Sequence, residues 1–210
     1  MASYSSEASS FKVPCVIVTT SAENWSMEEL SSVSIDDEKA GETIVDYLIE
    51  HGHTKIAEIG ANLELSQTAR LRHNGYLNSL KKHGITPDER YYERARFSYD
   101  SAYRAMKKLL EKDIEITAVY AISDVMAIGA LRAILDKGLR VPEDISITGF
   151  DGSTLAEYYN PKIVSIRQPH KDMAARSVEL LFNMIDLHKG SCHEIIPFEL
   201  TEGESVARID

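Results

Sequence analysis

The chain has 210 residues, of which 43% are hydrophobic and 27% charged, and 23 Lys and Arg stand against 33 Asp and Glu for a formal net charge of -10. This composition is ordinary for a soluble globular protein of one large domain or two small lobes, and the acidic balance argues against a DNA-binding surface within the chain, because affinity for nucleic acid rests mainly on Lys and Arg. No apolar run approaches the roughly 20 residues of a membrane span, and the first ten residues lack the basic start and apolar core of a signal peptide.

Short apolar runs alternate with longer amphipathic segments along the chain, which predicts strands alternating with helices. The strands are expected at 13–18, 56–59, 94–97, 118–122, 145–150, 163–167 and 195–200. The helices are expected at 37–51, 68–83, 101–111, from 124 to a stop at Gly138, and at 171–188. This alternation predicts right-handed βαβ units, and therefore an α/β fold whose parallel sheet is flanked by helices on both faces.

The segment from Asp124 to Asp151 predicts a helix followed by a buried strand that ends in an acid. Asp124 can cap the helix and Gly138 can end it. The apolar positions at helical spacing are Met126, Ile128, Leu131, Ile134 and Leu135. The strand then delivers Asp151 at its carboxyl end, which is where small ligands bind in open α/β sheets. The segment therefore predicts a binding site around Asp151, although a carboxylate that caps a loop or helix would explain the same residue.

Two polar residues early in the helix expected at 68–83 could face the same ligand. Arg72 offers a planar fork for a carboxylate, a phosphate or vicinal hydroxyls, although a lone helical Arg is usually a solvated charge. Thr68 lies one helical turn before Arg72 and could point in the same direction. A helix N-cap explains Thr68 equally well.

Motifs for catalysis or metal binding do not occur in the sequence. The seven His residues are spread out with no metal-ligand spacing, and there is no P-loop, Gly-x-Gly-x-x-Gly or Gly-x-Ser-x-Gly. We therefore assign no catalytic residue, no metal ligand and no cofactor. Cys15, in an apolar strand, and Cys192, in a loop, are typical of free thiols in a reducing cytoplasm.

Several longer motifs occur in a fixed order between about Val13 and Val206. They are VSID at 33–36, HGHTKIA at 51–57, RHNGY at 72–76, AISDVMAIGA at 121–130, GLRVPEDIS at 138–146, GFD at 149–151 and IRQP at 166–169. In these motifs the chain resembles the lactose-repressor/galactose-repressor family of bacterial transcription regulators. Members of that family carry a helix-turn-helix DNA reader, followed by a two-lobed effector domain like the periplasmic sugar-binding proteins.

The resemblance implies one complete C-terminal lobe, formed by 35–165 and 196–210, and the remainder of an N-terminal lobe, formed by 1–34 and 166–195. The lobes would be joined by crossings near Ile35, Ser165 and Pro197. The chain would be the effector-binding and dimerisation part of a cytoplasmic repressor, with DNA bound only through a reader that it lacks. The expected homodimer surface is the helix from Asp124 together with the strand at 146–149. A sugar-binding protein of a transport system shares the fold and remains the alternative.

The resemblance also implies roles for individual residues. Asp151 and Arg72 would hold polar groups of a sugar or nucleoside-like effector, with Thr68 beside them. Phe97 would stack on its flat or C–H-rich face. Ser123 stands where relatives often have Asn, so it keeps a hydroxyl but loses an NH2 donor. Gln168, just past a crossing, would reach the ligand from the other side of the cleft.

Overall fold

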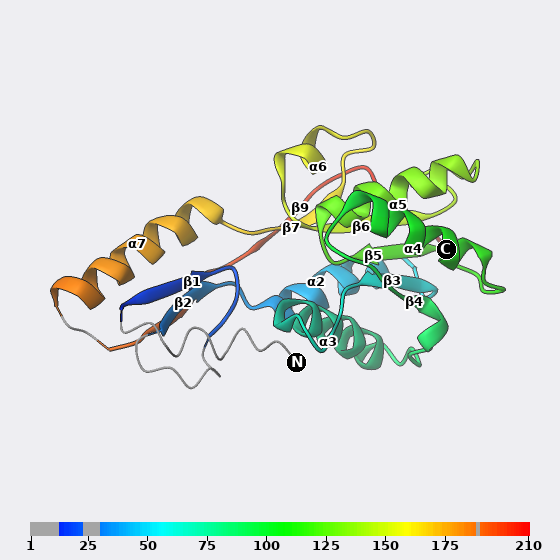
Figure 1. Cartoon of the computed structure of the whole chain (residues 1–210). Helices are drawn as coiled ribbons and strands as arrows, with labels where there is room; N and C mark the ends of the chain where they lie inside the picture. The colour runs from blue at the N-terminus through cyan, green and yellow to red at the C-terminus, as the bar shows by residue number, and fades with distance from the viewer. Residues whose placement is uncertain (1–12, 23–29, 188–189) are drawn as a thin grey trace. The chain divides into compact units, whose positions relative to one another are not determined.

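The computed structural model describes residues 13–22, 30–187 and 190–210. The chain divides into two compact units (Figure 1). Unit 1 consists of Met1–Asp36 and Pro169–Phe198, and unit 2 of Asp37–Gln168 and Glu199–Asp210. The three joins lie within a few residues of the crossings expected near Ile35, Ser165 and Pro197.

Unit 2 is built on a six-stranded sheet of order β4-β3-β5-β6-β7-β9. The strands are β3 Ile56–Gly60, β4 Tyr92–Arg94, β5 Ala118–Ala121, β6 Ser146–Asp151, β7 Val164–Arg167 and β9 Glu199–Thr201. Strands β4, β3, β5, β6 and β7 are mutually parallel, and β9 runs antiparallel to β7 at the edge. The predicted α/β fold with a mostly parallel sheet is confirmed.

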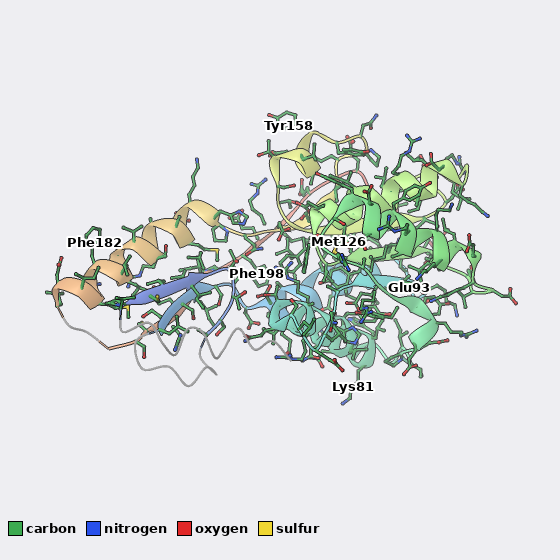
Figure 2. The ribbon with its side chains drawn as sticks, viewed as in Figure 1. Lys81, Glu93, Met126, Tyr158, Phe182 and Phe198 are labelled. Carbon is green, nitrogen blue, oxygen red and sulfur yellow. The ribbon has the colours of Figure 1, made fainter. Side chains whose placement is uncertain are left out.

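Helices cover both faces of this sheet. They are α2 Asp37–Glu50, α3 Gln67–Lys82, α4 Tyr99–Glu111 and α5 Asp124–Asp136, with a short α6 at Thr154–Tyr158 and a 3-10 turn η1 at Glu89–Tyr91. Helices α2 and α3 pack together, and α4 and α5 form a second pair (Figure 1). Right-handed crossovers explain this division. Helix α3 connects β3 to the edge strand β4, whereas α4 and α5 connect β4 to β5 and β5 to β6, in the opposite direction across the sheet. Met126 of α5 is fully buried (Figure 2).

Two glycines allow α2 and α3 to approach closely. A Cβ atom added to Gly41 would lie 2.7 Å from the carbonyl oxygen of Arg72. A Cβ atom added to Gly75 would overlap the carbonyl oxygen of Glu38. The pair of helices therefore depends on the absence of side chains at these two positions.

Gly75→Ala is expected to lower the free energy of unfolding by about 1–3 kcal/mol, because the added methyl group forces the two helices apart. Ala is the better helix former by roughly 0.5–1 kcal/mol, so intrinsic propensity acts in the opposite direction. Urea denaturation measures the change. Lys81→Ala is the control, because this side chain projects from the exposed face of α3 (Figure 2). An unchanged or increased stability for Gly75→Ala would contradict the packing argument.

Unit 1 contains a parallel three-stranded sheet of order β1-β2-β8, formed by β1 Cys15–Val18, β2 Leu30–Ser34 and β8 His193–Ile195. Helix α7, His170–Asp186, packs on β1 and β2. Its inward side chains are Met173, Leu180 and Met184. Arg176 of α7 binds the Glu194 carboxylate of β8 with two guanidinium nitrogens, which fixes the helix to that strand.

The structure corrects several sequence-based boundaries. The strand expected at 94–97 is β4 at Tyr92–Arg94, and the strand expected at 195–200 is two strands, β8 and β9, in different sheets. Strand β2 and helix α6 were not predicted. The strand expected at 13–18 is β1, Cys15–Val18, which pairs only with β2 among the described residues. The expected helix end at His188 falls outside the described residues.

The expected dimer surface is also corrected in part. Ser146, Ile147 and Thr148 are fully buried in β6, which lies between β5 and β7. This strand therefore cannot present a surface to a second chain. In α5, Leu135 is 43% exposed. None of the helices in the described ranges is both long and apolar enough to cross a membrane.

Candidate functional site

The carboxyl ends of five parallel strands lie at one edge of the unit 2 sheet, and the predicted site residues follow these ends. Phe97 comes after β4, Ser123 after β5, and Gln168 directly after β7, while Asp151 is the last residue of β6. Thr68 and Arg72 belong to α3, which follows β3. The parallel register therefore brings the predicted residues to a single edge of one unit.

Asp151 is the centre of this edge. Its backbone has φ +116°, a conformation that non-glycine residues rarely adopt and that costs of order 1–3 kcal/mol. The Gln168 side-chain amide donates to Asp151 Oδ1 at 2.8 Å, and the Gln168 backbone N–H donates to the Asp151 carbonyl oxygen at 3.2 Å. Arg72 Nη1 lies 3.6 Å from the same Oδ1 atom. With 31% of its side chain exposed, Asp151 is held in a strained position while it stays accessible to solvent.

Arg72 is held within the fold rather than at the surface. Its Nε donates to Asp37 Oδ1 at 2.8 Å and its Nη1 to the Ile122 carbonyl oxygen at 2.6 Å. Its guanidinium carbon lies 3.5 Å from the centre of the Phe150 ring, a cation–π contact. Only 3% of the side chain is exposed. The structure thus brings Arg72 and Asp151 together, and Arg72 supports the Asp151 carboxylate from inside the protein.

Asp124 fixes the loop that follows Asp151. Its Oδ2 accepts from the Ser153 backbone N–H and its Oδ1 from the Ser165 hydroxyl, both at 2.6 Å. The Ser165 oxygen in turn accepts from the Gly152 N–H at 3.1 Å. Burial raises the pKa of the Asp124 carboxyl, although these hydrogen bonds act against the shift. Asp124 therefore positions the β6–α6 turn.

The N-caps of α5 and α3 differ from the predicted ones. Ser123, not Asp124, caps α5 and accepts from the Met126 N–H through its hydroxyl at 3.3 Å. The N-cap of α3 is Ser66, whose hydroxyl accepts from the Ala69 N–H at 3.1 Å. Thr68 is therefore no cap and lies in the first turn of α3, half-buried.

Phe97 and Gln168 present different chemistry to the edge. The Phe97 side chain is 49% exposed, so its ring is free of the core that an isolated Phe would be expected to join. Gln168 is buried, and its Oε1 atom has no protein hydrogen-bond partner among the described residues. Its amide is engaged with Asp151 in the same unit, a contact that the sequence did not predict.

Sequence reasoning missed a second polar pair in unit 2. The carboxylate of Glu58, in the middle of β3, is fully buried, and its Oε2 lies 2.6 Å from His73 Nδ1 of α3. Its other oxygen, Oε1, has no protein partner in the described part of the chain. The available signal was the acid itself in the otherwise apolar strand IAEIG, because a buried charge requires a partner.

The stability contributed by the Glu58–His73 pair is expected to fall as pH rises. Burial raises the pKa of Glu58 above its ordinary value of 4.5. Burial alone would lower the pKa of His73, but the hydrogen bond and charge of Glu58 raise it above 6.5. Both pKa values are therefore higher in the folded protein than in the unfolded chain. Between the ordinary pKa of Glu58 and the raised pKa of His73, the two residues bind more protons when the protein is folded. Stability from the pair is complete below this window and is lost across it.

Urea denaturation between pH 4 and pH 9 tests whether the stability contributed by the Glu58–His73 pair falls as pH rises. The difference in unfolding free energy between the wild type and Glu58→Gln/His73→Gln should decrease with rising pH. His53, whose pKa is lowered by burial, acts in the opposite direction but is present in both proteins and cancels. A difference that grows with pH would mean that folding lowers the pKa values of the pair, against the raised values described above.

Comparison with known proteins agrees with this architecture. The periplasmic binding protein-like domain family matches residues 45–206. The HTH-type transcriptional regulator MalR of Clostridium butyricum is 39% identical over 199 residues, which are 94% of this chain and 59% of that protein. The HTH-type transcriptional repressor PurR of Pasteurella multocida is 34% identical over 174 residues, 83% of this chain and 51% of that protein. A solved transcriptional regulator CelR–cellobiose complex has a TM-score of 0.83 at 28% identity, covering 96% of this chain and 68% of that one.

A mostly parallel sheet with convergent polar residues at its carboxyl edge is an architecture typical of small-ligand binding. The chain belongs to the periplasmic binding protein-like domain family, as found in regulators of the lactose-repressor/galactose-repressor family. The resemblance drawn from the sequence motifs is thereby confirmed. The chain spans between half and three fifths of the length of these two curated relatives.

Proposed function

We propose that this chain is the effector-binding part of a cytoplasmic DNA-binding transcription regulator, and that its effector is a sugar or a related small metabolite. In this proposal the effector lies at the carboxyl edge of the unit 2 sheet, and unit 2 corresponds to the C-terminal lobe and unit 1 to part of the N-terminal lobe. The relatives are transcription regulators, which does not favour the transport-protein alternative. No catalytic step is assigned to the chain.

The observation that supports the proposal most is the strained and accessible carboxylate of Asp151. A backbone strain persists where the surrounding structure enforces it, and such positions cluster at binding sites. Gln168 and Arg72 orient this carboxylate by contacts at 2.8 Å and 3.6 Å. Carboxylates accept paired hydrogen bonds from vicinal hydroxyls, and an exposed ring such as Phe97 suits the C–H face of a sugar or a flat heterocycle.

The other proposed residues have different parts. Arg72 and Ser123 are both buried, so Arg72 would act on the effector mainly through Asp151 and Ser123 through the start of α5 that it caps, whereas the half-buried Thr68 would border the ligand. The buried Gln168 Oε1 is an acceptor suited to an effector hydroxyl, because it has no protein partner among the described residues. An effector that donates to it would satisfy a buried polar atom.

A homodimer is part of the proposal, as is DNA binding through the helix-turn-helix segment of the full regulator. The net charge of -10 gives the present chain no electrostatic basis for DNA affinity. Helix α7 carries an exposed apolar row on unit 1, formed by Val178, Phe182 and Ile185. Sedimentation at tens of micromolar should therefore show self-association, and a clean monomer would count against the dimer.

Isothermal titration of the chain with cellobiose, maltose, ribose and adenosine tests the effector class. We expect one of these classes to bind saturably, and Phe97→Ala to weaken that binding about tenfold through loss of ring contact. Leu135→Ala is the matched control, because its side chain is similarly exposed but lies in the last turn of α5, away from the carboxyl edge. The placement of the site would be rejected if both variants weakened binding equally, or if Phe97→Ala bound the ligand as tightly as the wild type.

A further inference from the structure

A hollow lies at the free edge of the unit 2 sheet, beside β4 and α3. Its volume is about 580 Å³, within the range of small-molecule pockets. The lining includes the rings of His73, Tyr76 and Tyr92 and the apolar side chains of Leu63, Leu77 and Pro87. Strand β4 is three strands away from β6, so at about 4.8 Å per strand the hollow lies roughly 14 Å across the sheet from Asp151.

The aromatic rings are held in place by hydrogen bonds that use their own polar atoms. The Tyr76 hydroxyl donates to the Ile56 carbonyl oxygen at 2.9 Å, and the Tyr92 hydroxyl to the Ala61 carbonyl oxygen at 2.7 Å. The His73 ring lies 5.2 Å from the Tyr92 ring, edge to face, and 6.2 Å from the Tyr76 ring. Tyr76 is buried, with 4% exposed, so the half-buried Tyr92 offers more of the ring surface, and both hydroxyls are already occupied.

His73 supplies the polar group of the hollow. Its Nδ1 is bound to the buried Glu58 carboxylate at 2.6 Å, so the ring orientation is fixed and Nε2 remains. Nε2 makes no hydrogen bond to another described residue, and the His73 side chain keeps partial access to solvent. A carboxylate at Nδ1 makes Nε2 an acceptor when the ring is neutral and a donor when it is charged.

The charges around the hollow favour an uncharged ligand. The His73 ring is paired with Glu58, and Asp88 is bound by Arg90 through three contacts of 2.6 to 3.1 Å. The exposed carboxylate of Glu89 also lines the hollow and disfavours an anion, whereas the His73 ring, when protonated, disfavours a cation beside Nε2. The rest of the lining is aromatic and apolar, and His73 Nε2 is a nitrogen in it that can either donate or accept a hydrogen bond.

We propose that this hollow is a second small-molecule site, separate from the Asp151 edge, which binds an uncharged aromatic ring carrying a hydroxyl group, that is, a phenol. The ring lies among Tyr76, Tyr92 and Leu77, and the hydroxyl meets His73 Nε2. A phenol hydroxyl both donates and accepts, so it fits either protonation state of His73. Burial raises the pKa of Tyr92 to about 12, so its own hydroxyl stays neutral beside the ligand.

Titration with p-cresol, followed through the imidazole nitrogen signals of His73 in an NMR spectrum, tests the site. We expect a saturable shift of the His73 Nε2 signal. Toluene, which has the same ring without the hydroxyl, should bind at least tenfold more weakly. Equal affinity for toluene would overturn the role of His73, and no saturable His73 shift up to the solubility of p-cresol would overturn the site.

Leu77→Trp, which fills the hollow, should weaken p-cresol binding more than tenfold, whereas Leu135→Trp on the exposed side of α5 should leave it unchanged. Undiminished binding by a folded Leu77→Trp protein would overturn the placement. If Leu77→Trp does not fold, the wild-type titrations with p-cresol and toluene decide the question alone. Competition by the sugar or nucleoside that binds the Asp151 edge would show that p-cresol occupies that edge, and would also overturn the proposal.

Discussion

Replacement of Arg72 by methionine is expected to lower the free energy of unfolding by about 3–5 kcal/mol, the cost typical of removing one partner from a buried ion pair. The Arg72 guanidinium donates to the carboxylate of Asp37, and both side chains are buried. Methionine fills much of the same volume but removes the cation from Asp37 and the donor from the Ile122 carbonyl oxygen. The buried carboxylate of Asp37 thereby loses the guanidinium that pairs with it.

Urea denaturation measures this loss, and two further proteins identify its cause. Asp37→Leu/Arg72→Met should recover part of the stability, because both members of the pair are replaced by apolar groups. Arg132→Met is the matched control, since Arg132 is paired with Asp136 on the exposed face of α5 and such pairs contribute little. A loss for Arg72→Met no larger than that for Arg132→Met would reject the buried pair as a determinant of stability.

The regular part of the fold follows from periodicity in the sequence. Strand β3 and helix α2 combine apolar residues at the expected spacing with clear ends, so both were predicted within one or two residues. Strand β2 was missed because its sequence, LSSVS, is mostly polar although it is wholly buried. Two of its serines have distant partners: the Ser31 hydroxyl donates to Met184 Sδ, and the Ser32 hydroxyl bonds to His193 Nδ1. Periodicity cannot show partners that lie more than 150 residues away.

The chain between 193 and 201 shows a different limit of sequence reasoning. The segment has the composition of one strand, but it passes from unit 1 to unit 2, and β8 and β9 join separate sheets. Pro197 has no N–H to donate to a ladder, which suits the interval between two sheets. Which sheet each half joins depends on tertiary pairing with β2 and β7.

The position of the candidate site was predictable, whereas the contacts within it were not. A strand that ends in Asp151 places a carboxylate at the carboxyl edge of a parallel sheet, whatever the rest of the chain does. The burial of Arg72 depends on Asp37 and Ile122, which lie 35 and 50 residues away in sequence. The positive φ of Asp151 likewise arises from tertiary context, since Asp is common in ordinary turns.

Asp151→Gly and Asp151→Ala are expected to weaken effector binding equally but to differ in stability. Both remove the carboxylate that we propose as an effector contact, which should cost about 1–3 kcal/mol, or roughly 5- to 150-fold in affinity. Alanine keeps the strained backbone at φ +116°, whereas glycine adopts that conformation freely. The strain costs of order 1–3 kcal/mol and the added flexibility of glycine costs roughly 0.5–1 kcal/mol in the opposite direction. The glycine variant should therefore be the more stable of the two by about 1 kcal/mol.

Isothermal titration with the sugar or nucleoside that binds the wild type measures the first effect, and urea denaturation measures the second. Gly152 provides a matched control for the backbone, because it has φ +65° and an added Cβ would lie 2.6 Å from the Arg167 Cα atom. Gly152→Ala should lower stability while it leaves the Asp151 carboxylate in the protein. If Asp151→Ala binds effector as tightly as the wild type, the carboxylate is not the ligand contact. If Asp151→Ala is as stable as Asp151→Gly, the strain at this position is no larger than the roughly 0.5–1 kcal/mol that glycine flexibility costs, and strain no longer supports Asp151 as a binding residue.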